Sequence, residues 1–316
     1  MVLQSGLFDE DLPEISVNKK VRMITLFSGY DSQCMAMKRI GADFEIHKTC
    51  EWQTVSTNLM KSVFHSEDDT DYSKELSDSD VITELLKMGV SINDETPVTD
   101  KELQRKGSAW CRKTYNNYKA TKNIGSITNI HGDDLEITDK DKYFYFMFYS
   151  FPCQDLSIAG KQKGMTKGTG TRSGLLFEVE RLLFELREKG IKEKGNPKAF
   201  LPDCLCLENV VQLHSAKNMP DFQQWINSLN GLGYTSYWQD CNAKFYGIPQ
   251  NRDRTFMISL LGNYDYSFPE TMPLEYCMAD VLEDEVDEKY FINNERAENL
   301  IQQLIVEKKI PKIENE

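Results

Sequence analysis

An uninterrupted aromatic run, Tyr143-Phe144-Tyr145-Phe146-Met147-Phe148-Tyr149, constrains the fold of this chain more than any other stretch. Seven residues without polar alternation predict a strand buried on both faces, as in the centre of a parallel sheet. Ser150-Phe151-Pro152-Cys153-Gln154 follows directly, and then a glycine-rich basic loop. Because ligands bind at the carboxyl ends of such strands, Cys153 is a candidate nucleophile. The alternative is a buried structural cysteine.

Composition limits the class of protein. With 316 residues, 40% of them hydrophobic, the chain can bury the core of one large α/β domain. The N-terminus has no secretory pattern, and no apolar stretch is long enough to cross a bilayer, so we expect a cytoplasmic protein without a membrane partner. Eight cysteines without a Cys-x-x-Cys pair predict reduced thiols and no metal site.

The charge balance is acidic. The formal net charge is −13, which argues against a chain that is a basic nucleic-acid clamp throughout. This does not exclude a local basic groove, and the loop Gly160–Arg172 carries Lys161, Lys163, Lys167 and Arg172 without an acidic residue.

The order of elements predicts a doubly wound, mostly parallel α/β sheet of the Rossmann type. Met23–Phe27 and Phe44–Cys50 read as strands on either side of a helix that carries Cys34, Met37 and Ile40. Later elements are expected at Ser173–Leu186, Asp203–Leu207, Phe222–Leu232, Thr235–Asp240, Arg254–Leu260 and Asn294–Lys308. We divide the chain into a polar extension (1–20), a catalytic domain (21–269) with a polar insertion at about 66–122, and a connection (270–316).

Several short motifs fall at the expected strand ends. Phe27-Ser28-Gly29-Tyr30 reads as a turn, Glu51 can accept hydrogen bonds from ribose hydroxyls, and Trp52 offers a face to an adenine ring. Taken singly, a turn glycine, a surface acid and a core indole are the simpler interpretations.

The order of these motifs is more specific than any one of them. Together with Pro152-Cys153-Gln154, Glu208-Asn209-Val210 and Gln250-Asn251-Arg252-Asp253-Arg254, the chain resembles the DNA (cytosine-5)-methyltransferase family of prokaryotes and phages. The resemblance covers roughly Met23 to Pro269. It implies methyl transfer from S-adenosyl-L-methionine to carbon 5 of a cytosine that is flipped out of double-stranded DNA.

The resemblance implies roles for individual residues. Cys153 would be the nucleophile that adds to carbon 6 of cytosine, and Glu208 would bind the Watson–Crick edge of the base. Arg254 would hold the carbonyl oxygen of the base, and Arg252 would support the Glu208 strand or the loop. The implied cofactor residues are Phe27, Ser28, Gly29, Tyr30, Glu51, Trp52, Ser126, Ile127, Pro152 and Leu176. The implied DNA and loop residues are Gln154, Ser157, Lys161, Lys163, Lys167, Arg172 and Asn209, of which Asn209 would order the turn after its strand.

Two residues depart from the family pattern in the cofactor region. Asp31 replaces a glycine, which would place a carboxylate near the methionine end of the cofactor and repel its carboxylate. Ser126 stands where the family has an acid. In addition, we find no equivalent of the family's target-recognition domain and returning helix after residue 270.

Three interpretations of this pattern stay open. The chain is the catalytic part of a split enzyme whose second polypeptide supplies target recognition, or a truncated product with little activity, or a binding module. Methylation of cytosine in tRNA is the alternative substrate. A cognate restriction endonuclease is a possible partner system for the split enzyme.

Overall fold

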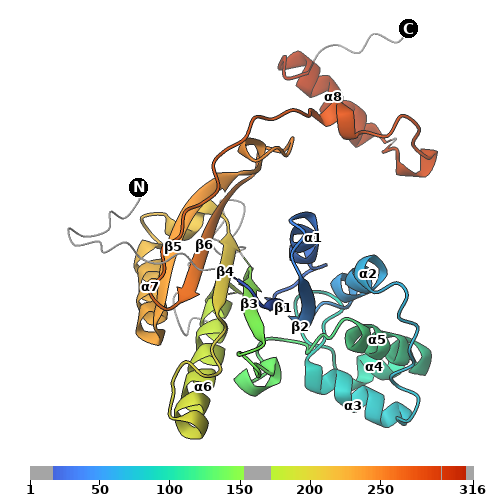
Figure 1. The fold of residues 1–316 in the computed structure, drawn as a ribbon. Coiled ribbons are helices and arrows are strands. Elements are labelled where there is room, and N and C mark those ends of the chain that lie inside the picture. The colour runs from blue at the N-terminus through green and yellow to red at the C-terminus, as the bar shows by residue number, and fades with distance from the viewer. Residues whose placement is uncertain (1–16, 153–171, 293, 311–316) are drawn as a thin grey trace, which may run out of the picture.

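The computed structural model describes residues 17–152, 172–292 and 294–310. Six strands and eight α-helices make up these parts of the chain (Figure 1). The strands are β1 (Lys20–Leu26), β2 (Phe44–Cys50), β3 (Tyr143–Tyr149), β4 (Cys204–Asn209), β5 (Tyr234–Asn242) and β6 (Asp253–Leu261). The helices are α1 (Ser32–Arg39), α2 (Thr54–Phe64), α3 (Asp78–Met88), α4 (Asp100–Lys106), α5 (Ser108–Ala120), α6 (Leu176–Lys194), α7 (Met219–Leu232) and α8 (Glu295–Val306).

The strands form one mixed sheet in the order β2-β1-β3-β4-β6-β5. Strands β2, β1, β3 and β4 are parallel, whereas β6 runs antiparallel to both β4 and β5. The expected mostly parallel, Rossmann-like sheet is therefore confirmed. Because β6 is reversed, its first residues lie at the same edge of the sheet as the carboxyl ends of the four parallel strands.

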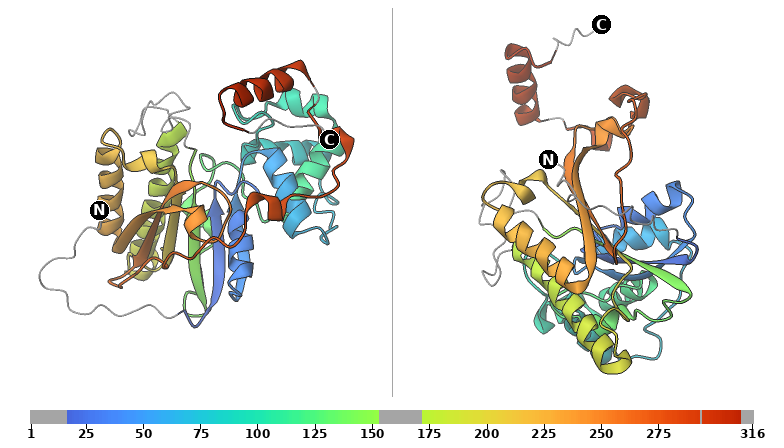
Figure 2. Two further views of the ribbon diagram at one scale, coloured as in Figure 1. Left: turned by 90° about the horizontal axis from the view of Figure 1, so that it is seen from above. Right: turned by 60° about the vertical axis from the view of Figure 1, so that its left-hand side comes forward.

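The aromatic strand β3 lies inside the sheet and alternates between two cores. Tyr145, Met147 and Tyr149 join the large core that α6 and α7 form on one face of the sheet. Phe144, Phe146 and Phe148 point the other way, toward α1 and toward Cys204 and Cys206. The views in Figure 2 agree with this layering, with α6 and α7 together on one side of the strands and α1 on the other. The strand packs on both faces, fully buried on the first and partly buried on the second, which explains why its side chains are apolar or aromatic throughout.

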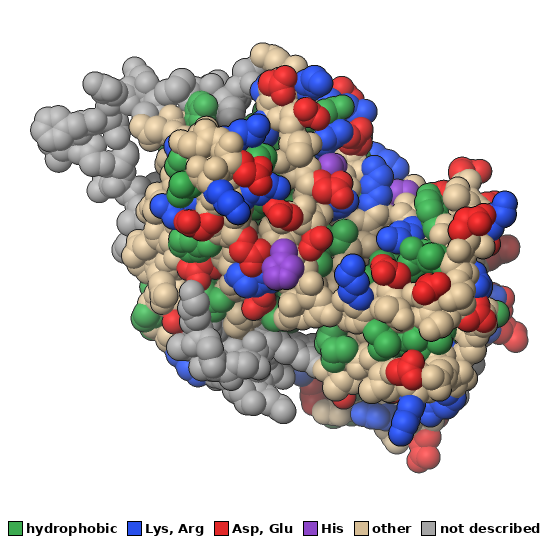
Figure 3. All heavy atoms as spheres, turned by 90° about the horizontal axis from the view of Figure 1, so that it is seen from below, with side chains coloured by type: hydrophobic (Ala, Val, Ile, Leu, Met, Phe, Trp, Pro, Cys, Tyr) green, Lys and Arg blue, Asp and Glu red, His purple; other side chains and the backbone are tan. Residues whose placement is uncertain are grey.

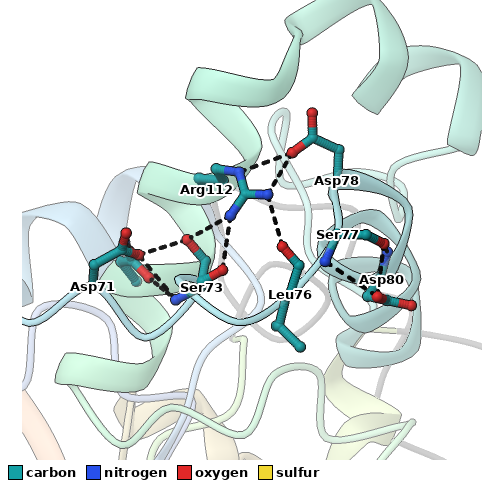
Figure 4. A network of polar contacts seen from close by, with 8 residues as sticks. Asp71, Ser73, Leu76, Ser77, Asp78, Asp80 and Arg112 are labelled. Carbon is teal, nitrogen blue, oxygen red and sulfur yellow. Dashed lines mark hydrogen bonds and ion pairs between the residues drawn. The ribbon is translucent and has the colours of Figure 1, made fainter.

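The segment predicted as a polar insertion is a helical unit with its own core. Its helices α3, α4 and α5 lie beyond the edge strand β2 (Figure 1) and enclose buried Val81, Leu85, Leu103 and Tyr118. The guanidinium of Arg112 ties the preceding loop to this unit (Figure 4). It donates to the carbonyls of Ser73 and Leu76 and to Asp78 Oδ1, at 2.6–2.8 Å.

The chain after β6 leaves the sheet. Met272 N donates to Phe245 O at 2.8 Å, and every described side chain between Pro269 and Arg296 is exposed. In Figure 1 and in the right-hand view of Figure 2, α8 stands apart from the rest of the molecule. None of its residues is buried.

Most expected elements are present with shifted ends. The last expected helix is α8, and the helix expected at Ser173–Leu186 is α6, which begins later and extends to Lys194. Ile124–Ile127 forms no strand, since pairing beside β2 is limited to a bridge between Asn123 and Thr49. Among the described residues, no helix is long and apolar enough to span a membrane.

Candidate functional site

The predicted motifs meet at one edge of the sheet. The carboxyl ends of β1, β2, β3 and β4 lead into Phe27, Glu51, Ser150 and Asn209, and antiparallel β6 begins nearby with Asp253. Segments separated by more than 200 residues in sequence thus form one rim. Two cavities open on this rim.

The turn after β1 is joined to the end of β2 by hydrogen bonds. Cys50 N donates to Ser28 Oγ at 3.0 Å, and Gly29 N donates to Glu51 Oε2 at 2.8 Å. Gln53 N donates to Glu51 Oε1 at 2.7 Å, so each carboxylate oxygen of Glu51 accepts one backbone N–H. Burial raises the pKa of the Glu51 carboxyl to about 7, and the two N–H groups oppose this shift. Glu51 is held rigidly, with acceptor capacity left for a ligand.

The first cavity, of about 390 Å³, lies above this turn. Of the ten predicted cofactor residues, Phe27, Glu51, Trp52, Ser126, Ile127 and Pro152 line it. Its size and its mixture of aromatic and polar groups suit a nucleoside-sized ligand.

The other four predicted cofactor residues have different positions. Ser28 is buried in the turn, Gly29 contributes its N–H to Glu51, and the Tyr30 side chain is exposed. Leu176, the first residue of α6, is fully buried in the core, whereas its neighbour Leu175 lines the cavity. The leucine at the cavity is therefore Leu175, the last residue of the short 3-10 turn Arg172–Leu175, and not the expected Leu176.

The helical unit contributes residues that the sequence analysis missed. Asp94 and Glu95 line the cavity, and Trp52 Nε1 donates to Asp94 Oδ1 at 2.9 Å. This bond fixes the plane of the Trp52 indole. Nothing in the sequence pattern pairs residues 52 and 94, because their contact depends on how the loop before α4 returns to β2.

A short polar chain crosses the rim beside the first cavity. Ser150 Oγ donates to Glu208 Oε2 at 2.7 Å, and Arg254 Nε lies 3.0 Å from Glu208 Oε1. The Arg252 guanidinium is 4.0 Å from the same oxygen and is more exposed. These contacts hold the Glu208 carboxylate in one orientation and stabilise its charge.

Asn209 connects β4 to the segment that leads to Cys153. Its side-chain amide donates to Phe151 O at 3.0 Å, and its Oδ1 accepts from Val210 N at 2.9 Å. Only 2% of Asn209 is exposed, so this residue orders the turn and does not present a surface to DNA.

The second cavity lies on the other side of Glu208. It has a volume of about 370 Å³, and Glu208, Arg252 and Arg254 form its polar end. Tyr246, Phe256, Tyr266 and Phe268 form its apolar wall. Ser150 and Pro152 belong to the first cavity, so the Ser150–Glu208–Arg254 chain lies where the two cavities approach each other.

Several predicted residues cannot be placed in this geometry. Cys153, Gln154, Ser157, Lys161, Lys163 and Lys167 lie outside the described residues, as does the side chain of Arg172.

Asp31 differs from the expectation that its carboxylate faces the cofactor. The residue is fully buried, does not line the cavity, and has left-handed backbone geometry (φ 64°). Within the described structure neither carboxylate oxygen has a hydrogen-bond partner, since the nearby Thr25 hydroxyl donates to Ser28 Oγ. Burial raises the pKa of Asp31 to about 7.

We expect Asp31→Asn to stabilise the ligand-free protein, and more so at pH 8 than at pH 5. A carboxyl whose folded pKa is raised destabilises the fold increasingly as pH rises from its unfolded value near 4 to about 7. Asparagine also tolerates left-handed geometry and stays neutral. Thermal unfolding at both pH values, with exposed Asp43→Asn as control, should show a rise in Tm of several degrees for Asp31→Asn alone. An equal effect at the two pH values would contradict the assignment.

Gly125 has a steric reason to be glycine. Its φ is 95°, and a Cβ would lie 2.3 Å from the Met88 carbonyl oxygen. Gly195 also has positive φ, at 62°, but open space around it. We expect Gly195→Ala to cost roughly 1–2 kcal/mol and Gly125→Ala about 1–3 kcal/mol more. Denaturant unfolding of the two variants measures the difference, and equal losses would refute the steric argument.

The two cavities at the rim can bind two kinds of ligand. The first cavity offers a fixed carboxyl, an indole and hydroxyls for a nucleoside, and the second offers a carboxylate backed by guanidinium groups for a polar ring. The described residues contain no cluster of His, Cys, Asp and Glu that could hold a metal ion. This combination of sheet order and rim defines a methyltransferase-type α/β protein.

Two solved structures have the same fold. The chain matches Entamoeba histolytica methyltransferase EhMeth with a TM-score of 0.51 and 14% identity, over 92% of this chain and 66% of that one. It matches the S. pombe Dnmt2 methyltransferase with a TM-score of 0.52 and 13% identity, over 90% and 66% of the two chains. At these identities the likeness establishes the fold alone.

Sequence comparison identifies the family. The model of the C-5 cytosine-specific DNA methylases matches residues 93–315, and the chain belongs to this family. It is accordingly a DNA (cytosine-5) methyltransferase, and its family uses S-adenosyl-L-methionine.

Two curated relatives match most of the chain. The type II methyltransferase M2.ScrFI of Lactococcus lactis subsp. cremoris is 32% identical over 87% of this chain and 71% of its own length. The orphan methyltransferase M.SssI of Spiroplasma monobiae is 34% identical over 87% of this chain and 68% of its own length.

Proposed function

We propose that this chain is the catalytic part of a DNA cytosine-5 methyltransferase that works with a second polypeptide for target recognition. The main support for the catalytic assignment is the set of polar contacts that links Ser150, Glu208 and Arg254 beside the two cavities. It supports a nucleoside cofactor on one side of Glu208 and a flipped cytosine on the other.

S-adenosyl-L-methionine fits the groups that line the first cavity. The Glu51 carboxyl would accept hydrogen bonds from the ribose hydroxyls, Trp52 would lie against the adenine, and the Ser126 hydroxyl would accept from its amino group. When bound, the cofactor supplies an electrophilic methyl group. Ser126 Oγ already shares a hydrogen bond with Thr128 Oγ1 at 2.9 Å, which orients it.

In the second cavity the chain's residues would activate cytosine. The thiolate of Cys153 adds to carbon 6, and the electron pair of the 5,6 double bond makes carbon 5 nucleophilic. Glu208 binds ring nitrogen 3 and shares a proton with it, while Arg254 holds the base carbonyl oxygen. After methylation, a base, a role that water can fill, removes the hydrogen at carbon 5 as a proton. The electron pair of that C–H bond restores the 5,6 double bond, and the pair of the carbon 6–sulfur bond leaves with the thiolate.

The proposal of a second polypeptide rests on charge. A net charge of −13 is unfavourable for binding DNA phosphates, which normally depends on Lys and Arg. Figure 3 shows the face opposite the rim, seen from below, where acidic and basic side chains are interspersed. A basic recognition polypeptide would supply the charge. We place the complex in the bacterial cytoplasm, with a restriction endonuclease as a possible companion.

A trapping experiment tests the catalytic proposal. Duplex DNA with 5-fluorocytosine is mixed with the chain and S-adenosyl-L-methionine, with and without a probe polypeptide made of the M.SssI residues that this chain does not match. Fluorine at carbon 5 cannot leave as a proton does, so the adduct persists, and mass spectrometry should find it on Cys153. No adduct in either mixture would overturn the proposal. The same experiment with tRNA that contains 5-fluorocytosine shows whether DNA or tRNA is the substrate, since only the substrate should be trapped.

Cofactor affinity is expected to depend on pH through Glu51. Its pKa near 7 means that the carboxylate, the stronger acceptor for ribose hydroxyls, predominates above this pH. We expect calorimetry to show tighter binding at pH 8 than at pH 6, by up to about tenfold. Glu51→Gln should bind more weakly and lose this pH dependence. A wild-type affinity that does not change with pH would contradict the role of Glu51.

A further inference from the structure

Trp52 is held by three hydrogen bonds from the helical unit that lies beyond β2 (Figure 1). Its carbonyl accepts from Ser91 N at 2.6 Å and from the Tyr118 hydroxyl at 2.8 Å, and its indole Nε1 donates to Asp94 Oδ1 at 2.9 Å. Ser91 and Tyr118 are fully buried. Ser91 O also accepts from Thr54 N at 2.9 Å, so the unit pairs with the chain directly after β2. Both the backbone and the ring of Trp52 are therefore placed by residues of the helical unit.

The turn that carries Asp94 is braced by its own hydrogen bonds. Ser91 Oγ donates to Thr96 O at 2.7 Å and accepts from Asp94 N at 3.1 Å. Asn93 Oδ1 accepts from the N–H groups of Glu95 and Thr96 at 2.9 and 3.0 Å. Asp94 has a φ of 60°, a left-handed conformation that aspartate adopts more readily than most residues. These contacts fix the direction of the Asp94 carboxylate before any ligand binds.

A second residue of the first cavity is hydrogen-bonded to the same unit. Ser126 N donates to Met88 O at 2.8 Å, and Met88 is the last residue of α3. Trp52 and Ser126 both line the cavity, and they are the two residues proposed to contact the adenine ring. The helical unit thus holds both purine partners, whereas the Glu51 carboxylate is held by the N–H groups of Gly29 and Gln53.

A fixed indole plane matters for a purine ligand. A purine packs against the face of an indole, and a side chain that must be ordered on binding loses conformational entropy. An indole whose N–H already donates to a carboxylate is oriented in advance, and a charged acceptor makes this bond stronger than a neutral one would. Asp94 and Glu95 line the cavity themselves, so the bond lies at the ligand space. A tie that served the fold alone would not need it, since Ser91 already pairs with the backbone after β2.

From these contacts we propose that Asp94 is a positioning residue for the purine ring of the cofactor, because it holds the Trp52 indole in the plane against which an adenine nucleoside packs. This inference rests on the proposed function and assigns part of the cofactor site to the helical unit. Asp94 acts through Trp52 and needs no contact with the ligand.

The test compares two replacements of Asp94 in the whole chain. Asp94→Gly removes the carboxylate and tolerates the left-handed backbone, whereas Asp94→Asn keeps an oxygen that can accept from Trp52 Nε1. In calorimetry, Asp94→Gly should bind S-adenosyl-L-methionine about 5- to 10-fold more weakly, as for the loss of one hydrogen bond, and adenosine by the same factor. Asp94→Asn should stay within about twofold of the wild type. The matched control is Asp69→Gly, whose native side chain is 95% exposed, and it should bind both ligands as the wild type does.

A double-mutant cycle shows whether Asp94 acts through Trp52. Phenylalanine at position 52 keeps an aromatic face but has no N–H to donate. In the Trp52→Phe background, Asp94→Gly should therefore change the affinity for either ligand by less than about twofold. An equal loss in the two backgrounds would mean that Asp94 contacts the ligand directly or only supports the fold, and it would overturn the positioning role.

The outcomes separate this inference from the proposed function. Unchanged affinity in Asp94→Gly overturns the positioning role, as does a loss for S-adenosyl-L-methionine without a loss for adenosine, or no binding of either ligand to the wild type. An adduct trapped on Cys153 together with any of these results leaves the proposed function standing. Purine binding that depends on Asp94 only when Trp52 is present, without any trapped adduct, supports the positioning role and removes the proposed function.

Discussion

Replacing Cys153 by serine is expected to abolish the covalent adduct with 5-fluorocytosine DNA and to lower methyl transfer by about 10⁴-fold or more. A serine hydroxyl at neutral pH is a far weaker nucleophile than a thiolate, so carbon 5 of the cytosine stays unactivated. The measurements are mass spectrometry of the trapped complex and single-turnover transfer of a labelled methyl group.

Cys241→Ser is the matched control for this loss. Cys241 lines the cavity that contains Glu208, but it lies on β5 and has no role in the proposed reaction. The variant should retain the adduct. If the adduct forms on Cys241, or if it still forms in the Cys153→Ser variant, then Cys241 and not Cys153 is the nucleophile.

Glu208→Gln is expected to slow methyl transfer by about 10²–10⁴-fold while leaving cofactor affinity nearly unchanged. The amide is similar in shape and can keep contacts with Ser150 and Arg254, but it cannot share a proton with ring nitrogen 3. Glu208 is absent from the wall of the first cavity, which is why cofactor binding should survive.

The control for Glu208→Gln is Glu188→Gln. Glu188 pairs with Arg187 on the exposed side of α6, and its loss should change neither rate nor affinity. Single-turnover kinetics with saturating cofactor give the rate, and calorimetry gives the affinity. A Glu208→Gln rate within threefold of wild type would contradict a role for this carboxylate in proton sharing.

Sequence patterns predicted the site best where the chemistry depends on residues next to strand ends. Glu208, Arg252 and Arg254 lie together because β4 and β6 pair antiparallel, and their motifs stand at adjoining ends of these strands. Glu51 and Trp52 line the first cavity for the same reason, since Glu51 follows the last residue of β2.

The sequence patterns did not predict the position of a side chain where that position depends on the direction of the side chain or on long-range packing. Leu176 and Leu175 differ in direction after a 3-10 turn, and Asp31 is buried under its own turn in left-handed geometry. Neither feature has a periodic signal in the sequence. The tertiary structure also shows that α3, α4 and α5, within the polar segment 66–122, enclose a core of their own.

The aromatic run Tyr143–Tyr149 by itself determined a central strand, because only a position inside a sheet lets such a run pack apolar side chains on both faces. With the motifs that follow the strands, it also determined the fold class and the family. The tertiary structure alone decided that Asp94, from the helical unit, fixes Trp52, and that α8 extends its apolar face into water. The physical reason is that hydrogen bonding within strands and turns is local, whereas the wall of a cavity and the burial of a helix depend on which distant segments pack against them.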